Sequence, residues 1–205
     1  MTILSLYWAP ASPFVRKVMV SAHELGFGDH IDCLDSAANP VDRDPRVQAV
    51  NPLARVPAAL AADGTSLFDS RVICEYLDSL APDGPRLFPT GAARWTALRR
   101  QALADGVTEA GLLTRYERLL RPADLQWPLW QEKQLEKSQD GLSAMAEDLP
   151  ASGEADIGAI SYACALGWLD FRFPDLNWRA GREDLAVWFA GFETRASMQA
   201  TRPKA

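Results

Sequence analysis

Ser12-Pro13-Phe14-Val15-Arg16-Lys17-Val18 follows a short apolar run at residues 3–8, so this stretch marks the point where a strand ends and a helix begins. Serine is a favoured N-cap, and proline suits the first helical position because its missing N–H would have no partner there. The free N–H groups at a helix N-terminus carry partial positive charge. Most serines at such a junction only cap their helix, but the same geometry also stabilises an anion placed beside Ser12.

Strand and helix patterns alternate over residues 1–81, as in a sheet covered by helices. The expected elements are, in chain order, a strand at 2–8, a helix at 13–25, a strand at 31–34, at most a short helix within 39–51, strands at 58–60 and 66–68, and a helix from 70. Asp63-Gly64 is a hairpin dipeptide between the last two strands, and Ser70 is expected to cap the final helix. The order βαβαββα predicts an α/β fold for this part.

The rest of the chain carries helical periodicity and no convincing strand pattern. Ala81-Pro82-Asp83-Gly84-Pro85 interrupts every regular pattern, so we expect a domain at 1–81, a linker at 82–91 and an all-helical domain at 92–205. The expected helices run over residues 92–121, 129–149, 156–173 and 182–195. Apolar and small side chains in the third of these predict a buried central helix, and the six tryptophans of this half are expected to form core.

Composition excludes several classes of function. The chain has 205 residues, 48% of them hydrophobic, and a formal net charge of −6, which argues against holding nucleic acid or anionic lipid by bulk attraction. Three scattered cysteines and two histidines predict neither a disulfide framework nor a metal site, and they leave little material for a Ser-His-Asp triad. No stretch approaches the ~20 apolar residues of a membrane span, and the apolar opening lacks the features of an export signal. We therefore expect a cytoplasmic protein.

Three motifs occur in a fixed order along the chain: Ser-Pro-Phe at residues 12–14, Asn-Pro-Leu-Ala-Arg-Val-Pro at 51–57, and Phe-Asp-Ser at 68–70. With an α/β part followed by a helical part, the whole chain resembles the glutathione transferases and is most similar to bacterial serine-type members. The resemblance implies a thioredoxin-like N-terminal domain and an all-α helical-bundle C-terminal domain. It also implies glutathione as a co-substrate, with no tightly bound cofactor.

The resemblance implies that Ser12 donates its hydroxyl to the sulfur of glutathione. A thiol with a pKa of ~8.5 becomes mostly thiolate at neutral pH after a shift of roughly two units, which requires ~2.7 kcal/mol. A hydrogen bond to a charged acceptor supplies ~1.5–3 kcal/mol and a helix N-terminus ~0.3–1 kcal/mol, so the sum is sufficient. Tyr7 is a rival, because tyrosine-type relatives keep their activating hydroxyl at the end of the first strand, although a strand-end tyrosine is more often packing.

The other motifs would bind the remaining parts of glutathione. Val56 precedes Pro57 where the family has a cis proline, so the backbone of Val56 would pair with the cysteinyl part. Asp69 and Ser70 match the acidic-serine pair that grips the γ-glutamyl end, where the carboxylate faces the α-amino group and Ser70 binds the α-carboxylate. Glutamate is the usual acidic residue of that pair. Arg55 matches a basic position near the glycine carboxylate, although a solvated side chain is equally expected there.

The electrophile pocket is expected between the two domains. The loop that contains Trp8 and Ala11 would form one wall, and the first long helix of the second domain would form the other. Leu112, Arg115 and Tyr116 are the candidates on that helix, since they lie within about one turn of each other. Helical periodicity leaves open whether these three side chains face the pocket or a partner, so the electrophile itself stays undetermined.

The leading hypothesis is a glutathione S-transferase that conjugates the thiolate to a hydrophobic electrophile, as in detoxification. The alternative is a non-catalytic binding or carrier protein that keeps the fold. Thiol–disulfide chemistry ranks lowest, because a serine cannot form a mixed disulfide and Cys74 lies in an apolar helical pattern. Exposed positions such as Leu119, Leu120 and Trp127 allow the homodimer that is common in the family. In that family Ser or Thr usually caps the central helix, and Gly153 stands at the matching position.

Overall fold

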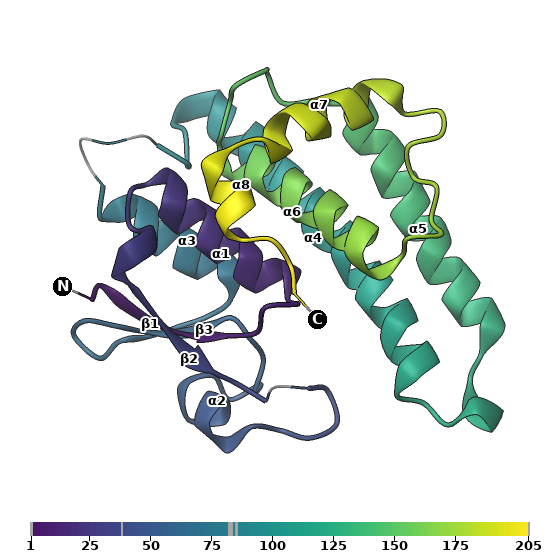
Figure 1. The fold of residues 1–205 in the computed structure, drawn as a ribbon, viewed down its shortest axis with the longest axis horizontal. Coiled ribbons are helices and arrows are strands. Elements are labelled where there is room, and N and C mark those ends of the chain that lie inside the picture. Colours follow the sequence, from purple (N-terminus) through teal and green to yellow (C-terminus); the bar gives the residue numbers. More distant parts are fainter. Residues whose placement is uncertain (1, 38, 82–83, 85, 205) are drawn as a thin grey trace.

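The computed structural model describes residues 2–37, 39–81, 84 and 86–204. An α/β part is followed by a helical part, and Figure 1 shows the two side by side. The α/β part consists of β1 (Leu4–Trp8), α1 (Pro13–Glu24), β2 (Ile31–Asp35), α2 (Pro45–Val50), β3 (Ala58–Ala61), β4 (Ser66–Leu67) and α3 (Ser70–Ser79). The helical part consists of α4 (Gly91–Leu119), α5 (Pro128–Glu147), α6 (Ile157–Arg172), α7 (Glu183–Glu193) and α8 (Ala196–Ala200). The 3₁₀ turns η1 (Gly28–His30) and η2 (Ala123–Leu125) complete these elements.

The four strands form one mixed sheet in the order β2-β1-β3-β4. β1 pairs parallel with β2 and antiparallel with β3, and β3 pairs antiparallel with β4. Because side chains alternate along a strand, Leu4 and Leu6 point into the main core while Tyr7 packs against the small cluster around α2. Figure 1 shows α1 and α3 on one face of the sheet and α2 at the other. The expected order βαβαββα and the thioredoxin-like fold are confirmed.

Helix α1 lies between α3 and α6, so it is enclosed on nearly every side. The expected apolar face at Val15, Val18 and Ala22 is buried. Arg16 and Lys17 are buried as well, which an amphipathic pattern does not predict. Burying a cation is costly unless it is paired or hydrogen-bonded, so these two side chains need partners from the helical part.

Helix α6 is the centre of the helical part, as expected from its sequence. Every residue from 157 to 169 is buried, because the helix is covered by α4 on one side and by α1 on another. The close approach of α4 depends on a glycine. A Cβ atom added to Gly111 would lie 2.7 Å from the ring of Trp168, which is itself buried and packs edge-on against Phe173.

Gly111→Ala is expected to lower the free energy of unfolding by about 1–3 kcal/mol, because the added methyl group overpacks the contact with Trp168. Gly106→Ala on the same helix is the matched control. A Cβ at Gly106 would meet nothing within 4 Å, so alanine there should stabilise the protein by about 0.5–1 kcal/mol. Urea denaturation of both variants measures the two effects. Equal midpoints for both would contradict the proposed packing.

Two helices begin differently from the sequence-based expectation. Asp69, not Ser70, caps α3: its backbone is extended and its carboxylate accepts a hydrogen bond from the Arg71 N–H at 2.9 Å. Aspartate caps a helix as well as serine does, and here it stands one residue earlier. The central helix starts after Asp156, whose carboxylate accepts from the Ala159 N–H at 2.8 Å, so Gly153 is not its cap.

Other differences are smaller. α8 was not expected from the sequence, and β1 starts at Leu4 rather than at residue 2. The prediction that the tryptophans form core holds for Trp168 and Trp178, but Trp95 and Trp127 are exposed on the helical part. The expected linker at 82–91 includes residues 82, 83 and 85, which lie outside the described residues. Across the ranges that are described, no helix has both the length and the apolar character needed to cross a membrane.

Candidate functional site

Ser12 stands in the turn between β1 and α1, as expected. Its N–H donates to the Ala9 carbonyl at 2.9 Å, and its hydroxyl oxygen accepts from the Val15 N–H at 3.3 Å. Pro13 occupies the first helical position, where a backbone N–H would have no partner within the helix, and proline has no such N–H. The hydroxyl proton of Ser12 stays available for an acceptor, because the capping bond uses an oxygen lone pair. An anion beside this hydroxyl would also lie at the positive end of α1.

The residues at 51–57 form a loop that Asn51 holds in place. The buried amide of Asn51 accepts from the Leu53 N–H at 3.1 Å and donates to the Arg55 carbonyl at 2.9 Å. The peptide bond between Val56 and Pro57 is cis. Within the described ranges, no hydrogen bond uses the backbone N–H or C=O of Val56. The loop therefore presents a free donor and a free acceptor, as the edge of a strand does.

The pairing of the strands brings the three motifs to one end of the sheet. Tyr7 lies opposite Ala58 in the antiparallel pair of β1 and β3, so the turn after β1 is adjacent to the loop before β3. Ala59 lies opposite Leu67 in the pair of β3 and β4, so the start of α3 is adjacent to the same loop. Ser12, Val56-Pro57 and Asp69-Ser70 thus converge, although up to 58 positions separate them in the sequence.

The Asp69-Ser70 pair sits at the N-terminus of α3. The Asp69 side chain is exposed and, among the described residues, bonds only to the Arg71 N–H, while Ser70 is buried in the first turn. The free N–H groups of this helix end add partial positive charge beside a buried hydroxyl. This combination suits a carboxylate ligand, and the nearby Asp69 carboxylate suits an ammonium group.

A buried ion network ties the site to the helical part. Asp105 of α4 accepts from Lys17 of α1 at 2.6 Å and from Arg71 of α3 at 2.9 Å. Lys17 is only 1% exposed, and Asp105 is nearly as enclosed. Arg71 is adjacent in sequence to Ser70, so Asp105 fixes the first turn of α3 relative to α1. The sequence of α1 predicts an amphipathic helix with exposed cations. Lys17 can be buried there because the Asp105 carboxylate pairs with it.

Arg16 of α1 is the second buried cation. It donates to the Met198 carbonyl at 3.1 Å, so it joins α1 to α8. A Cβ atom added to Gly167 would lie 2.4 Å from the Arg16 guanidinium, so that glycine makes room for the side chain in α6. The Met198 carbonyl is thus the hydrogen-bond acceptor for Arg16, while its Nε and Nη1 are buried without a partner among the described residues.

The five residues expected to form the electrophile pocket lie on both parts of the molecule. Trp8 lines a cavity of about 40 Å³ together with Arg16 and the C-terminal residues Thr201 and Arg202. Neither Ala11 nor the three residues on α4 line that cavity. Leu112 packs against the main core, and Arg115 is half-buried. Their joint role as a pocket stays a prediction.

Tyr116 is a partly exposed residue of α4. Burial raises the pKa of the Tyr116 phenol, and the positive charges of Arg55 and Arg115 oppose that rise. The charges that act on this phenol therefore come from both parts of the chain, Arg55 from the α/β part and Arg115 from α4. This arrangement brings Arg55 to the side of the molecule where the electrophile residues were expected.

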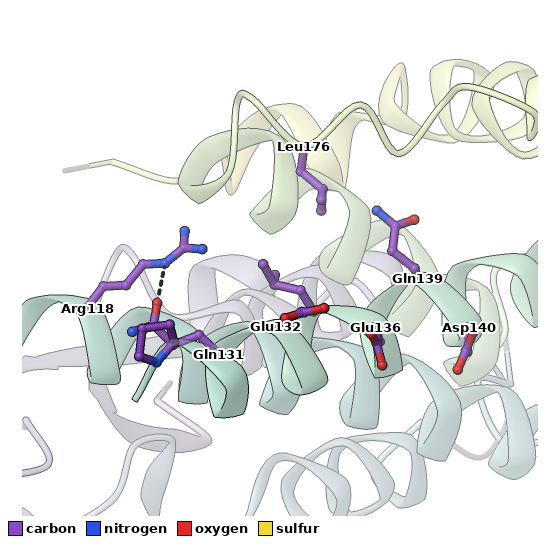
Figure 2. A pocket seen from close by; sticks show the side chains of 9 residues that line it. Arg118, Gln131, Glu132, Glu136, Gln139, Asp140 and Leu176 are labelled. Carbon is purple, nitrogen blue, oxygen red and sulfur yellow. Dashed lines mark hydrogen bonds between the residues drawn. The ribbon is translucent and has the colours of Figure 1, made fainter. Parts of the chain in front are cut away.

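A groove of about 640 Å³ lies elsewhere, on the outside of α5, and none of the expected site residues lines it. Figure 2 shows Glu132, Glu136 and Asp140 along its α5 side, with Leu176 across from them. These three carboxylates outnumber Arg118, the cation that also lines the groove, so the charge of the lining disfavours an anion. This groove is therefore no candidate for binding a small anionic peptide.

Comparison with known proteins identifies the family. Models of the N-terminal and C-terminal domains of glutathione S-transferases match residues 11–80 and 101–191. YibF of Escherichia coli K12, described as an uncharacterized GST-like protein, is 31% identical over 206 residues, with 98% of each chain covered. The chain belongs to the glutathione S-transferase family. The resemblance that the three motifs indicated is thereby confirmed.

Solved structures of the family are similar over almost the whole chain. A glutathione transferase family member from Pseudomonas fluorescens Pf-5 with bound glutathione has a TM-score of 0.91 and 43% identity, covering 98% of this chain and 100% of that one. A second structure from the same organism, with bound S-(propanoic acid)-glutathione, has a TM-score of 0.90 at the same identity and coverage.

Sequence reasoning missed the residues that support this transferase-family site. Asp105 lies inside a long helical pattern, where an acid normally indicates a solvated face. The signal that could have found it is the pair Arg16-Lys17 between valines on an otherwise apolar helix, since a cation there needs a partner. The C-terminal residues around Thr201 line the cavity beside Trp8 and carry no sequence motif.

Proposed function

We propose that this chain binds glutathione at the end of the sheet where the three motifs converge, and conjugates its thiolate to a hydrophobic electrophile. The observation that supports the proposal is the strand register, because it sets the turn after β1 and the start of α3 beside the loop before β3. Each group of the tripeptide then has a partner of suitable chemistry. The glutathione-bound relative from P. fluorescens, at 43% identity, supports the same ligand for this chain.

In this proposal Ser12 activates the thiol. Its hydroxyl donates to the sulfur, and the N-terminus of α1 adds a favourable field, so the thiolate forms near neutral pH without a general base. Tyr7 is the weaker candidate, because it packs against the cluster around α2 on the face of the sheet opposite to α1. Conjugation then needs only an electrophile placed beside the sulfur.

The backbone of Val56 would form two hydrogen bonds with the cysteinyl part, because its N–H and C=O have no partner among the described residues. Asp69 would face the α-amino group of the γ-glutamyl end, and Arg55 would face the glycine carboxylate. The electrophile would lie between Trp8, Ala11 and the α4 residues. The bound S-(propanoic acid)-glutathione of the P. fluorescens relative supports room for a substituent on the sulfur.

Ser70→Ala is expected to raise the KM for glutathione roughly ten- to a hundredfold while kcat stays nearly constant. The buried hydroxyl would bond a carboxylate far from the reacting sulfur, and a hydrogen bond to a charged group contributes about 1.5–3 kcal/mol in ground and transition state alike. Ser79→Ala at the other end of α3 is the control, because that hydroxyl donates only to the Tyr76 carbonyl. Steady-state kinetics with varied glutathione measures both variants; an unchanged KM in Ser70→Ala would remove this residue from the site.

The test of the proposal as a whole combines binding with turnover. Calorimetric titration with glutathione measures binding, and a chlorodinitrobenzene assay measures conjugation. Binding together with turnover supports a transferase. Binding without turnover supports the alternative, a carrier protein that keeps the fold. The absence of binding would reject both.

Thiol–disulfide chemistry has little support. Burial raises the pKa of the Cys74 thiol to about 12 and that of Cys164 to about 11, so neither forms a reactive thiolate at neutral pH. Burial also raises the pKa of the thiol of Cys33, an exposed residue of β2.

Three further expectations stay predictions: the homodimer, the division into domains at 1–81 and 92–205, and the cytoplasmic location. The exposed Leu119, Leu120 and Trp127 are consistent with a covered apolar surface.

A further inference from the structure

Two arginines stand together where α4 passes the end of α6. The backbone of Gly111 packs against the rings of Trp168 and Phe173. A Cβ atom added to Gly111 would lie 2.7 Å from the Trp168 ring and 3.5 Å from the Phe173 ring. Arg115 lies one helical turn further along the same face of α4. Arg172 immediately precedes Phe173 at the end of α6, and both arginines are half-buried. The packing therefore puts Arg115 and Arg172 at neighbouring positions on two helices that are in contact.

Neither guanidinium has a carboxylate partner within residues 2–37, 39–81, 84 and 86–204. The acids nearest in sequence are held by other side chains. Asp170 pairs with Arg179 at 2.6 Å, and Glu117 pairs with Arg121 at 2.8 Å. Half-buried cations without a counter-ion are costly to keep close together, so an anion from outside would be favoured between them.

The positive charges of the two arginines repel each other. Burial lowers the pKa of Arg172, and the positive charge of Arg115 lowers it further. Burial raises the pKa of the Tyr116 phenol, and the positive charges of Arg55 and Arg115 oppose that rise. In the region around Tyr116, the positive charges of Arg55 and Arg115 thus act on the phenol, and the charge of Arg115 acts on Arg172.

This region lies at the end of the molecule where Ser12 is found. The Arg16 guanidinium, four residues after Ser12 on α1, lies against Gly167 of α6. Figure 1 shows that α1 begins and α6 ends on the same side of the molecule, so the two helices run in opposite directions. The six residues from Gly167 to Arg172 therefore run toward the N-terminus of α1, where the proposed thiolate would form.

We propose that the electrophile of this transferase carries a carboxylate, held between Arg115 and Arg172. The inference rests on the proposed function, because it assigns a substrate class to the same site. Two guanidinium groups match a carboxylate through charge and through paired N–H donors. An α,β-unsaturated acid is the simplest substrate of this class.

The reaction with such an acid is balanced. The glutathione thiolate bonds to the β-carbon, the π electron pair moves to the α-carbon, and that carbon takes a proton from water, so no group leaves. A free carboxylate activates a double bond poorly, because the negative charge resists the electron pair. The two arginines would offset that charge as it grows toward the carboxylate, which is stabilisation of the transition state.

The test compares two ready-made conjugates by calorimetry: S-(propanoic acid)-glutathione, and S-propylglutathione as the uncharged counterpart. The wild-type protein is expected to bind the acid at least about tenfold more tightly than the propyl compound. Arg115→Gln and Arg172→Gln are each expected to abolish most of this preference while glutathione itself binds as in the wild type. Arg118→Gln is the matched control, because Arg118 is exposed on the same helix and donates to Gln131.

The outcomes separate this inference from the proposed function. Equal binding of the two conjugates, or a preference that survives both arginine variants, overturns the carboxylate assignment while leaving glutathione binding intact. Failure of the wild type to bind glutathione at all overturns the proposed function, and the carboxylate assignment with it.

Discussion

Ser12→Ala is expected to lower kcat/KM for the proposed conjugation by roughly ten- to a hundredfold, because the variant would lose a hydrogen bond to a charged sulfur that contributes about 1.5–3 kcal/mol. The loss should be largest near neutral pH, where the wild-type thiol is ionised and the variant's thiol is not. The fall should shrink as the pH rises above the pKa of free glutathione, since the thiolate then forms unaided. A pH profile of conjugation measures both features.

The controls separate activation from folding. Ser12 also caps α1, and replacing a serine cap by alanine costs about 1 kcal/mol of stability. Glycine keeps most of the capping energy without a hydroxyl, so Ser12→Gly should lose activity like alanine with little loss of stability. Ser12→Thr restores a hydroxyl and should recover part of the rate. Tyr7→Phe should keep the wild-type rate; a rate that falls in Tyr7→Phe and persists in Ser12→Ala would assign activation to Tyr7.

Asp105→Asn is expected to destabilise the protein by about 3–5 kcal/mol, because it leaves Lys17 buried as a cation without a carboxylate. For a chain of this length such a loss lowers the midpoint of thermal unfolding by roughly 10 °C or more. Arg71→Gln should cost much less, since the Arg71 side chain is half exposed. Thermal unfolding followed by circular dichroism measures both variants.

A double variant tests whether the charge itself causes the loss. Lys17→Met combined with Asp105→Leu removes both ions and fills similar volume, so most of the stability should return. Asp140→Asn is the control for a carboxylate on an exposed helix face and should change the midpoint little. An unfolding midpoint in Asp105→Asn equal to that of the wild type would show that the buried network does not stabilise the fold.

Most of the fold follows from local signals in the sequence. The hairpin at Asp63-Gly64 and the short helix allowed within 39–51 both occur in the structure, because turn residues and proline restrict the backbone directly. The residues that cap the helices were predicted less exactly. Asp69 and Asp156 cap their helices in place of Ser70 and Gly153, since several neighbouring residues can serve as caps and tertiary packing selects among them.

The site could be predicted only in part. The motifs at 12–14, 51–57 and 68–70 are visible in the sequence, but their convergence depends on strand register, which is a property of pairing across distance. The partner of Lys17 could not be predicted, because Asp105 comes from a helix 88 positions away. The prediction that the tryptophans form core is wrong for Trp95, which is exposed, because aromatic residues are buried only on average.

The central claim is that this protein ionises the glutathione thiol at Ser12. The most direct measurement is the ultraviolet difference absorbance of bound glutathione thiolate, titrated through neutral pH with the wild type and with Ser12→Ala. We predict thiolate at neutral pH in the wild type, with an apparent pKa about two units below the free thiol value of ~8.5, and a return toward that value in the variant. Bound glutathione that stays protonated until the pH approaches the pKa of the free thiol would contradict the account.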